Sequence, residues 1–445
     1  MTATKPNVLI VTTHDSGRHF GCYGIPTVHT PAIDAFAADG ICFDRMFAAS
    51  PICSPSRGAL LTGRYPLRNG LVGLAGGSWN WELNDYREHL SHRLRGHGYH
   101  TAMFGLQHDT AFLDRLGFDD TRAHGIKRDG KPRNASAVAA DVASFISGYD
   151  KDQPFYAQVG FFETHTSYRF ADCEPDDGLG AFIPPYAMAH NWPSWNQILQ
   201  RFEGAPDAAQ QHIAEFQGSL REVDRGVGIV LQALEARGLA ENTIVVFNTD
   251  HGPELPGAKW TLYDAGIGIA FILRWPGGGV CGGHRDDALH GNVDFLPTLY
   301  DWLGLQTTVP FDGVSFAGEC GAITGGKPAP ARSCIYSSWV DGLNFCVRTS
   351  RFKLIRNLVP LDASGRESPK YEMYDLDKDP LELVNVAGMP SYAAEFSRLR
   401  EQLVNWRRDV GDPSCDKPIA EAEHHAMLAE YRKHYEEQRK VNYPT

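Results

Sequence analysis

One short stretch of the chain, residues 50–65, places a cysteine and an arginine where they could share an anion. It reads S-P-I-C-S-P-S-R-G-A-L-L-T-G-R-Y. Pro55 suits the first position of a helix, because its φ is fixed and its missing N–H is not needed there. A helix that starts near Ser54 turns Cys53 and Arg57, four residues apart, to one side. A helix N-terminus beside a guanidinium favours a thiolate or a bound anion. A lone cysteine here would more often be structural.

Two apolar runs, N-V-L-I-V-T-T and T-I-V-V-F-N, are each followed by a histidine and an aspartate. His14 and Asp15 follow the first run, and Asp250 and His251 follow the second. Ligands of an open parallel sheet bind beyond the carboxyl ends of its strands, so these pairs are expected to converge. Asp15, Asp250 and His251 would then form a metal site. Taken singly, each aspartate could instead cap the segment that follows it.

Strand and helix patterns alternate over most of the chain. Continuous apolar runs predict strands at 7–13, 41–47, 99–104, 155–160, 243–248 and 267–274. Periodic and capped segments predict helices at 31–39, 86–95, 134–147, 208–236 and 293–303. This alternation predicts an α/β fold with a large, mostly parallel sheet between helices.

The alternation of strands and helices changes after residues 321–330, a Gly- and Pro-rich segment that we expect to lie between two domains. Short strands are predicted at 333–339, 345–349, 352–356 and 371–374, followed by helices at 392–408 and 420–438. We therefore expect a catalytic domain at 1–330 and a smaller C-terminal α+β domain, an antiparallel sheet with helices, at 331–445.

Composition and net charge exclude some kinds of partner for this protein. The 445 residues are 42% hydrophobic and carry a formal net charge of −12, which argues against a nucleic-acid partner. No apolar run is long enough to span a membrane, and no signal-like segment precedes the first strand, so we expect a cytoplasmic protein without a membrane partner. The nine cysteines are odd in number and form no C-x-x-C pair, which indicates neither a disulfide framework nor a zinc ribbon.

The string C-S-P-S-R-x-x-L-L-T-G-R resembles the signature of formylglycine-dependent (type I) sulfatases in the alkaline phosphatase superfamily. Y-E-M-Y-D-L-D-K-D-P-L-E-L and N-V-D-F-L-P-T-L-Y-D also look like segments of that family. The resemblance implies that a formylglycine-generating enzyme oxidises Cys53, that the hydrated aldehyde attacks sulfur, and that Arg57 holds the reacting oxygens. It implies an alkaline phosphatase-like fold, and the chain looks closest to the sulfamidase-like branch.

The same resemblance bears on the metal. T-D-H-G, containing Asp250 and His251, matches the second metal segment of the family, and Asp15 and the modified Cys53 match further ligands. Sulfatases usually have two consecutive aspartates after the first strand, whereas here His14 stands in place of the first. Calcium is the expected ion, although an imidazole ligand would suit Mn²⁺ or Zn²⁺ better.

Three further residues match functional positions of the family. His108 matches the histidine that assists the formylglycine hydrate, His165 the histidine at the leaving group, and Lys259 the lysine that contacts sulfate. The family motif G-K-W-H reads G-L-Q-H here, so Leu106 replaces a lysine, and Gln107 or a distant arginine could substitute for it. Outside the family context, His165 would be a surface histidine and Lys259 a solvated lysine.

The resulting hypothesis is a sulfatase that hydrolyses a sulfate ester or an N-sulfonated amine on a carbohydrate or other small molecule. A phosphonate monoesterase or phosphodiesterase of the same superfamily is the first alternative. A catalytically silent, ligand-binding relative is the second, because His14 and Leu106 depart from the family pattern. The aromatic tracts at 79–81 and 186–195 could line a sugar cleft or simply pack, and a homo-oligomer is possible.

Overall fold

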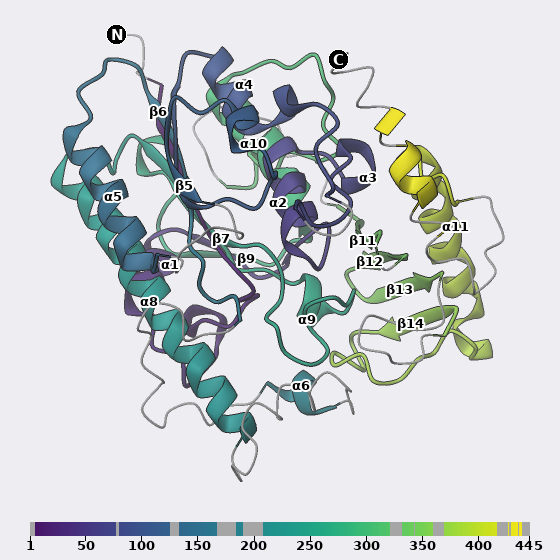
Figure 1. The fold of residues 1–445 in the computed structure, drawn as a ribbon. Helices are drawn as coiled ribbons and strands as arrows, with labels where there is room; N and C mark the ends of the chain where they lie inside the picture. The colour runs from purple at the N-terminus through teal and green to yellow at the C-terminus, as the bar shows by residue number, and fades with distance from the viewer. Residues whose placement is uncertain are drawn as a thin grey trace.

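Two sheets organise the chain in the computed structural model (Figure 1). The structure describes residues 5–76, 80–124, 133–166, 184–189, 208–320, 332–341, 343–358, 369–415, 426, 429–434 and 436–437. Within these residues, eight strands form a large sheet and four form a separate antiparallel sheet. None of the described helices is long and apolar enough to cross a membrane.

The large sheet is parallel through its centre and mixed at one edge. Its strands, in spatial order, are β5 (Asp120–His124), β4 (His100–Leu106), β6 (Phe155–Gly160), β1 (Asn7–Thr13), β7 (Thr243–Thr249), β8 (Phe271–Arg274), β2 (Ile41–Phe43) and β9 (His284–Asp286). The first five run parallel, whereas β8 pairs antiparallel with both β7 and β2. The prediction of a mostly parallel sheet is confirmed.

The central strand β1 decides where the polar residues after it lie. All seven of its residues are buried, as expected for an apolar strand covered on both faces. It pairs in parallel with β7 so that Thr13 lies opposite Thr249. Because the two strands end at the same level, His14 and Asp250 leave the sheet side by side.

Helices cover both faces of the large sheet (Figure 1). One face packs against α1 (Pro31–Asp39), α5 (Ala135–Gly148) and α8 (Ala208–Ala236), and the other against α2 (Cys53–Thr62), α4 (Leu90–Gly96) and α10 (Phe295–Leu303). The short elements are η1 (Gly21–Tyr23), α3 (Pro66–Asn69), η2 (Tyr86–Glu88), η3 (Leu113–Leu116), α6 (Pro185–Ala189), α9 (Asp264–Ile267), η5 (Pro276–Gly278), η6 (Asn292–Asp294) and η7 (Pro390–Tyr392).

The second sheet forms the C-terminal part of the molecule. Its strands, in order, are β11 (Cys334–Trp339), β12 (Asn344–Thr349), β13 (Phe352–Asn357) and β14 (Tyr371–Asp375). Helix α11 (Ala393–Asp409) packs on it through Leu399, Leu403 and Trp406. The expected antiparallel sheet with a helix is confirmed. The Gly- and Pro-rich segment 321–330 lies outside the described residues, so a domain boundary at residue 330 stays a prediction.

Several predicted elements have different boundaries in the structure. The strand predicted at 41–47 is interrupted by a turn, and its second half, β3 (Met46–Phe47), pairs with β10 (His290–Gly291) instead. The strand predicted at 267–274 begins only at β8, because its first residue ends α9. The helix predicted at 86–95 is divided into η2 and α4. Of the helix predicted at 420–438, the described residues 429–434 are helical.

The helix that carries the cysteine begins two residues before Pro55, which was expected at its first position. Helix α2 starts at Cys53 itself, with Ile52 as its extended N-cap, and Pro55 is its third residue. Proline is accommodated there because none of the first four N–H groups of a helix has an intrahelical acceptor. Gly63 ends the helix with a φ of 67°, a left-handed conformation in which a side chain would be strained.

Candidate active site

The first turn of α2 faces the carboxyl ends of β1 and β7. Cys53 is buried at this point, with its Sγ 3.3 Å from His251 Nε2 and 3.9 Å from Asp15 Oδ1. Both partners come from loops that follow the two central strands. The helix start and the strand ends, distant in the sequence, therefore meet around one thiol.

The two aspartates form the base of this cluster. Asp250 Oδ1 accepts hydrogen bonds from the backbone N–H groups of Asp15 (3.0 Å) and His251 (2.9 Å). His251 Nε2 lies 3.1 Å from Asp15 Oδ1, and His14 Nδ1 lies 3.1 Å from Asp250 Oδ2. Both imidazoles therefore contact a carboxylate that is inaccessible to water. The structure brings together all five residues predicted for the metal site.

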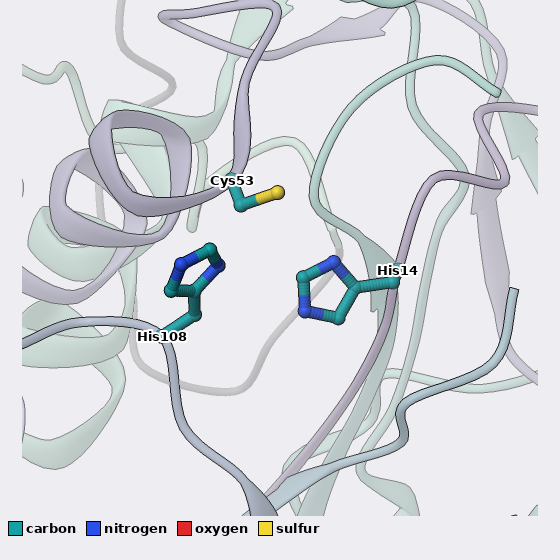
Figure 2. A group of neighbouring side chains, drawn as sticks. All are labelled: His14, Cys53 and His108. Atoms are coloured by element: carbon teal, nitrogen blue, oxygen red, sulfur yellow. The ribbon is translucent and has the colours of Figure 1, made fainter. Parts of the chain in front are cut away.

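The arrangement fits a cation. Ligand atoms of His14, Asp15, Cys53 and Asp250 all lie within 4.8 Å of one another, and so do those of His14, Cys53 and His108. Figure 2 shows the Cys53 sulfur and the rings of His14 and His108 facing one space from three different segments. Both ring nitrogens of His14 and Nδ1 of His108 are buried and make no hydrogen bond, so these donor atoms fit the role of metal ligands.

Two cationic side chains neutralise the aspartates. Arg57 Nε donates to Asp250 Oδ2 at 3.1 Å, and Lys259 Nζ donates to Asp15 Oδ2 at 2.6 Å. Lys259 Nζ also lies 3.5 Å from Glu254 Oε2. Burial alone would lower the pKa of Lys259, but the negative charges of Asp15 and Cys53 outweigh burial and raise it. Lys259 therefore stays charged, and one terminal nitrogen of Arg57 remains without a partner.

The same charges act on the thiol. Burial raises the pKa of Cys53, but the neighbouring His14 and Lys259 outweigh burial and hold that pKa well below its usual range. His108 shows the opposite behaviour, because burial lowers its pKa despite the contact with Cys53. Residue 53 is thus set in a cationic environment, beside an imidazole that is neutral at pH 7.

His165 lies on the open side of the cluster. Its ring is 5.5 Å from that of His14, centroid to centroid, and its side chain is half-buried. Nδ1 lies 2.8 Å from the backbone oxygen of Thr166, so Nδ1 carries the proton of the neutral ring and Nε2 points elsewhere. Thr166 donates in turn to Glu254, which links this loop to Lys259.

Leu106 stands where the family has a lysine, and the neighbouring Gln107 does not take over the role of that lysine. Leu106 ends β4 fully buried, and the side chain of Gln107 is occupied locally. Its Nε2 donates to the backbone oxygen of Thr110, and its Oε1 accepts from the backbone N–H groups of Asp109 and Thr110. Gln107 therefore shapes the turn that carries His108 and does not reach the cluster as a substitute for lysine.

Sequence reasoning missed two acidic residues of this region. Glu254 was given no role, although it lies between the metal segment and Lys259 in the sequence. Asp109, directly after His108, is fully buried, accepts from Gln158 Nε2 at 2.9 Å, and its charge helps to raise the pKa of Arg57. Its position beside a predicted catalytic histidine was the only available signal. Of the aromatic tracts, Trp81 is buried and donates to Asp341, and Tyr186 lines a cavity with Ser16 and Pro253. Residues 79 and 190–195 lie outside the described residues, so a role of these tracts in a sugar cleft stays a prediction.

Comparison with known proteins decides the family. The family model described as sulfatase matches residues 6–305, which include every residue of the cluster. The chain belongs to the sulfatase family. A second model, described as the C-terminal part of N-sulphoglucosamine sulphohydrolase, matches residues 258–409. This sulfatase is accordingly a sulfuric ester hydrolase, and its second sheet is of the sulfamidase type.

Curated relatives span nearly the whole chain. An ulvan-active sulfatase of Formosa agariphila is 27% identical over 92% of this chain and 76% of the relative. Human N-sulphoglucosamine sulphohydrolase is 25% identical over 92% of this chain and 91% of the relative. Both relatives carry names of sulfate-removing enzymes, in agreement with the family.

Solved structures share the fold. A protein solved in complex with its substrate D-glucosamine-2-N,6-O-disulfate superposes with a TM-score of 0.74 at 21% identity, covering 93% of this chain and all of the other. A phosphonate monoester hydrolase of Agrobacterium radiobacter gives 0.71 at 22% identity, with 91% and 96% covered. Sulfatases and phosphonate hydrolases therefore have this architecture in common, and the architecture does not separate the two reactions.

Proposed function

We propose that this sulfatase removes a sulfate group, O- or N-linked, from a saccharide, with Cys53 oxidised to formylglycine and a divalent cation in the adjoining cluster. The observation that carries the proposal is the position of Cys53 in the first turn of α2, within 4 Å of His251 and Asp15. The saccharide is inferred from the names of the relatives, which include ulvan-active and glucosamine-type enzymes.

Asp15, Asp250, His251 and residue 53 would hold the cation, which would draw charge from the sulfate oxygens and supply a nucleophile at residue 53 near neutral pH. The unpartnered terminal nitrogen of Arg57 is available for one sulfate oxygen. Lys259, already charged and buried, is available for another. Together they favour the negative charge that develops on sulfate during attack.

Two histidines are placed to move protons. His108 is neutral at pH 7 because burial lowers its pKa, so it can accept a proton from residue 53. His165 Nε2 is not the nitrogen that contacts Thr166, so in the imidazolium form, with both ring nitrogens protonated, it can donate its proton to the leaving oxygen or nitrogen. Glu254 fixes the loop that carries His165 through Thr166, and contacts Lys259 on its other side.

The test combines peptide mass spectrometry with turnover measurements. Protein co-expressed with a formylglycine-generating enzyme should carry an aldehyde at Cys53 and hydrolyse sulfated or N-sulfonated glucosamine. Cys53→Ala should lose this turnover by more than about a thousandfold. Cys281→Ala, at a half-buried cysteine outside the cluster, serves as the matched control and should keep it.

Other outcomes separate the alternatives. Faster turnover of phosphonate esters than of every sulfate would identify the phosphonate monoesterase or phosphodiesterase reaction instead. An unmodified thiol with no turnover of any ester, after each metal is added, would identify a silent relative.

A further inference from the structure

The fully buried imidazole of His14 has no role in the family pattern. Neither of its ring nitrogens makes a hydrogen bond of acceptable geometry, although Nδ1 lies 3.1 Å from Asp250 Oδ2 and 3.5 Å from Asp15 Oδ1. An imidazole removed from water is normally bonded through both nitrogens or bound to a metal. His14 is therefore aimed into the cluster, where its Nδ1 contacts two carboxylates and neither ring nitrogen is held by a hydrogen bond.

We propose that His14 is a direct ligand of the cation, and that His14 and His251 together make this a Mn²⁺ or Zn²⁺ site rather than a Ca²⁺ site. The inference rests on the proposed function, since it concerns the cation of that same cluster.

The spacing of the donor atoms agrees with this assignment. Ligands bound at 2.0–2.1 Å in a tetrahedral site lie about 3.3 Å from each other. In the cluster, His14 Nδ1 lies 3.1 Å from Asp250 Oδ2, His251 Nε2 lies 3.1 Å from Asp15 Oδ1, and Cys53 Sγ lies 3.3 Å from His251 Nε2. Neighbouring donors in the cluster therefore have the spacing of a small ion's ligands, and the donor atoms of His14, Asp15, Cys53 and Asp250 all lie within 4.8 Å of one another.

The carboxylates have few oxygen atoms left for calcium. Asp15 Oδ2 accepts from Lys259, and Asp250 Oδ2 accepts from Arg57. Asp250 Oδ1 already accepts two backbone N–H groups. Calcium takes six to eight oxygen ligands and often uses carboxylates through both oxygens. Each carboxylate here can offer at most one well-placed oxygen, so the described cluster falls short of a calcium shell.

The imidazole nitrogens of His14 and His251 supply metal ligands that the carboxylate oxygens do not. Imidazole suits zinc and other transition metals, and manganese accepts mixed nitrogen and oxygen shells. The replacement of an aspartate by His14 also removes one negative charge, which weakens the attraction for a hard cation such as calcium. The earlier expectation of calcium has not been tested, and the donor set argues against it.

The experiment is a metal competition on the full chain. Protein stripped with a chelator is dialysed against equal concentrations of Ca²⁺, Mn²⁺ and Zn²⁺, and the bound metal is measured by elemental mass spectrometry. Wild-type protein should retain Mn²⁺ or Zn²⁺ and exclude Ca²⁺. His14→Asp should lower the affinity for Mn²⁺ by about 10–100-fold and bring Ca²⁺ into the site. His29→Asp, the same change at an exposed histidine, should leave the preference unchanged.

A spectroscopic measurement on the wild type protects the test against a variant that does not fold. Pulsed electron paramagnetic resonance of the Mn²⁺-loaded protein should show coupling to two imidazole nitrogens, from His14 and His251. Coupling to one nitrogen, or retention of Ca²⁺ over both other ions, would overturn the proposal. Neither readout depends on turnover. Because residue 53 is itself a proposed ligand, both readouts are made on protein that carries the aldehyde at residue 53 and on Cys53→Ala, and the preference for Mn²⁺ or Zn²⁺ over Ca²⁺ should hold in both. Failure of the proposed function would show separately, as a missing aldehyde at Cys53.

Discussion

Lys259 Nζ lies 2.6 Å from Asp15 Oδ2, and both side chains are buried. An ammonium is thus held against a carboxylate that we assign to the cation. The contact joins residues 244 positions apart in the chain and brings the loop after β7 to the end of β1. It keeps Lys259 charged beside the cluster in which we propose that the cation and the sulfate bind.

Lys259→Met should destabilise the metal-free protein by about 3–5 kcal/mol, because it leaves the Asp15 carboxylate buried without a cationic partner. Added divalent cation should restore part of that loss by supplying the missing positive charge. Urea unfolding with and without chelator measures both effects. Lys259→Arg keeps the charge and should lose less. Equal losses in the two variants, unaffected by cation, would show that the pair has no electrostatic role.

His165→Ala should reduce turnover selectively, according to the leaving group. If His165 protonates the departing atom, sugar sulfates with poor leaving groups should lose about 10²–10⁴-fold in kcat. Aryl sulfates whose phenolate leaves unaided should lose much less. Steady-state kinetics on a series of aryl and sugar sulfates gives the comparison. A uniform loss across the series would assign His165 to binding rather than to proton transfer.

The raised pKa of Glu163 predicts that the stability of the protein depends on pH. Burial raises its pKa to about 7, opposed by hydrogen bonds that include one from the Ala135 backbone N–H. The ordinary pKa is 4.5, so the protonated form is favoured in the folded protein, and the stability it contributes is full below pH 4.5 and lost as pH rises towards 7.

Glu163→Gln removes this titration while keeping an acceptor for Ala135. The variant should be more stable than wild type at pH 8 by up to about 3 kcal/mol, with little difference at pH 4.5. Unfolding free energies at the two pH values test this, with exposed Glu235→Gln as the control. A difference that is the same at both pH values would contradict the assignment.

Lys353 couples the second sheet to the loop that carries Lys259. Its Nζ lies 2.6 Å from Asp264 Oδ1 and 2.7 Å from Glu382 Oε1, and donates to the backbone oxygen of Leu262 at 3.0 Å. The side chain is fully buried. Asp264 has a second cationic partner in Arg348, 2.9 Å away, whereas Lys353 is the cation recorded beside Glu382.

Lys353→Met should therefore cost about 3–5 kcal/mol of unfolding free energy, and the added change Glu382→Gln should recover part of it by removing one unpaired charge. Exposed Lys378→Met is the matched control and should change stability by less than about 1 kcal/mol. Recovery that fails in the double variant would show that Glu382 is not charged in the folded protein.

Much of the fold followed from local patterns. The run N-V-L-I-V-T-T is apolar and β-branched, so it indicates a buried central strand whatever surrounds it, and β1 is that strand. The predicted strand boundaries that were wrong are those that depend on which strand pairs with which. Met46 belongs to a separate strand because β10 pairs with it there, and no local pattern encodes that pairing.

The features of the site also divide into those that the sequence indicates and those that only the structure shows. The sequence by itself determined the family and the polar pairs after two parallel strands, and it predicted the nucleophile position, because each depends on residue type and short spacing. Only the tertiary structure decided that the ring nitrogens of His14 make no hydrogen bond in the cluster and that Gln107 bonds to the backbone of its own turn. It also decided that Lys259 pairs with Asp15 and Lys353 with Asp264. Those facts depend on which side chains meet across segments far apart in the chain, and packing sets such contacts.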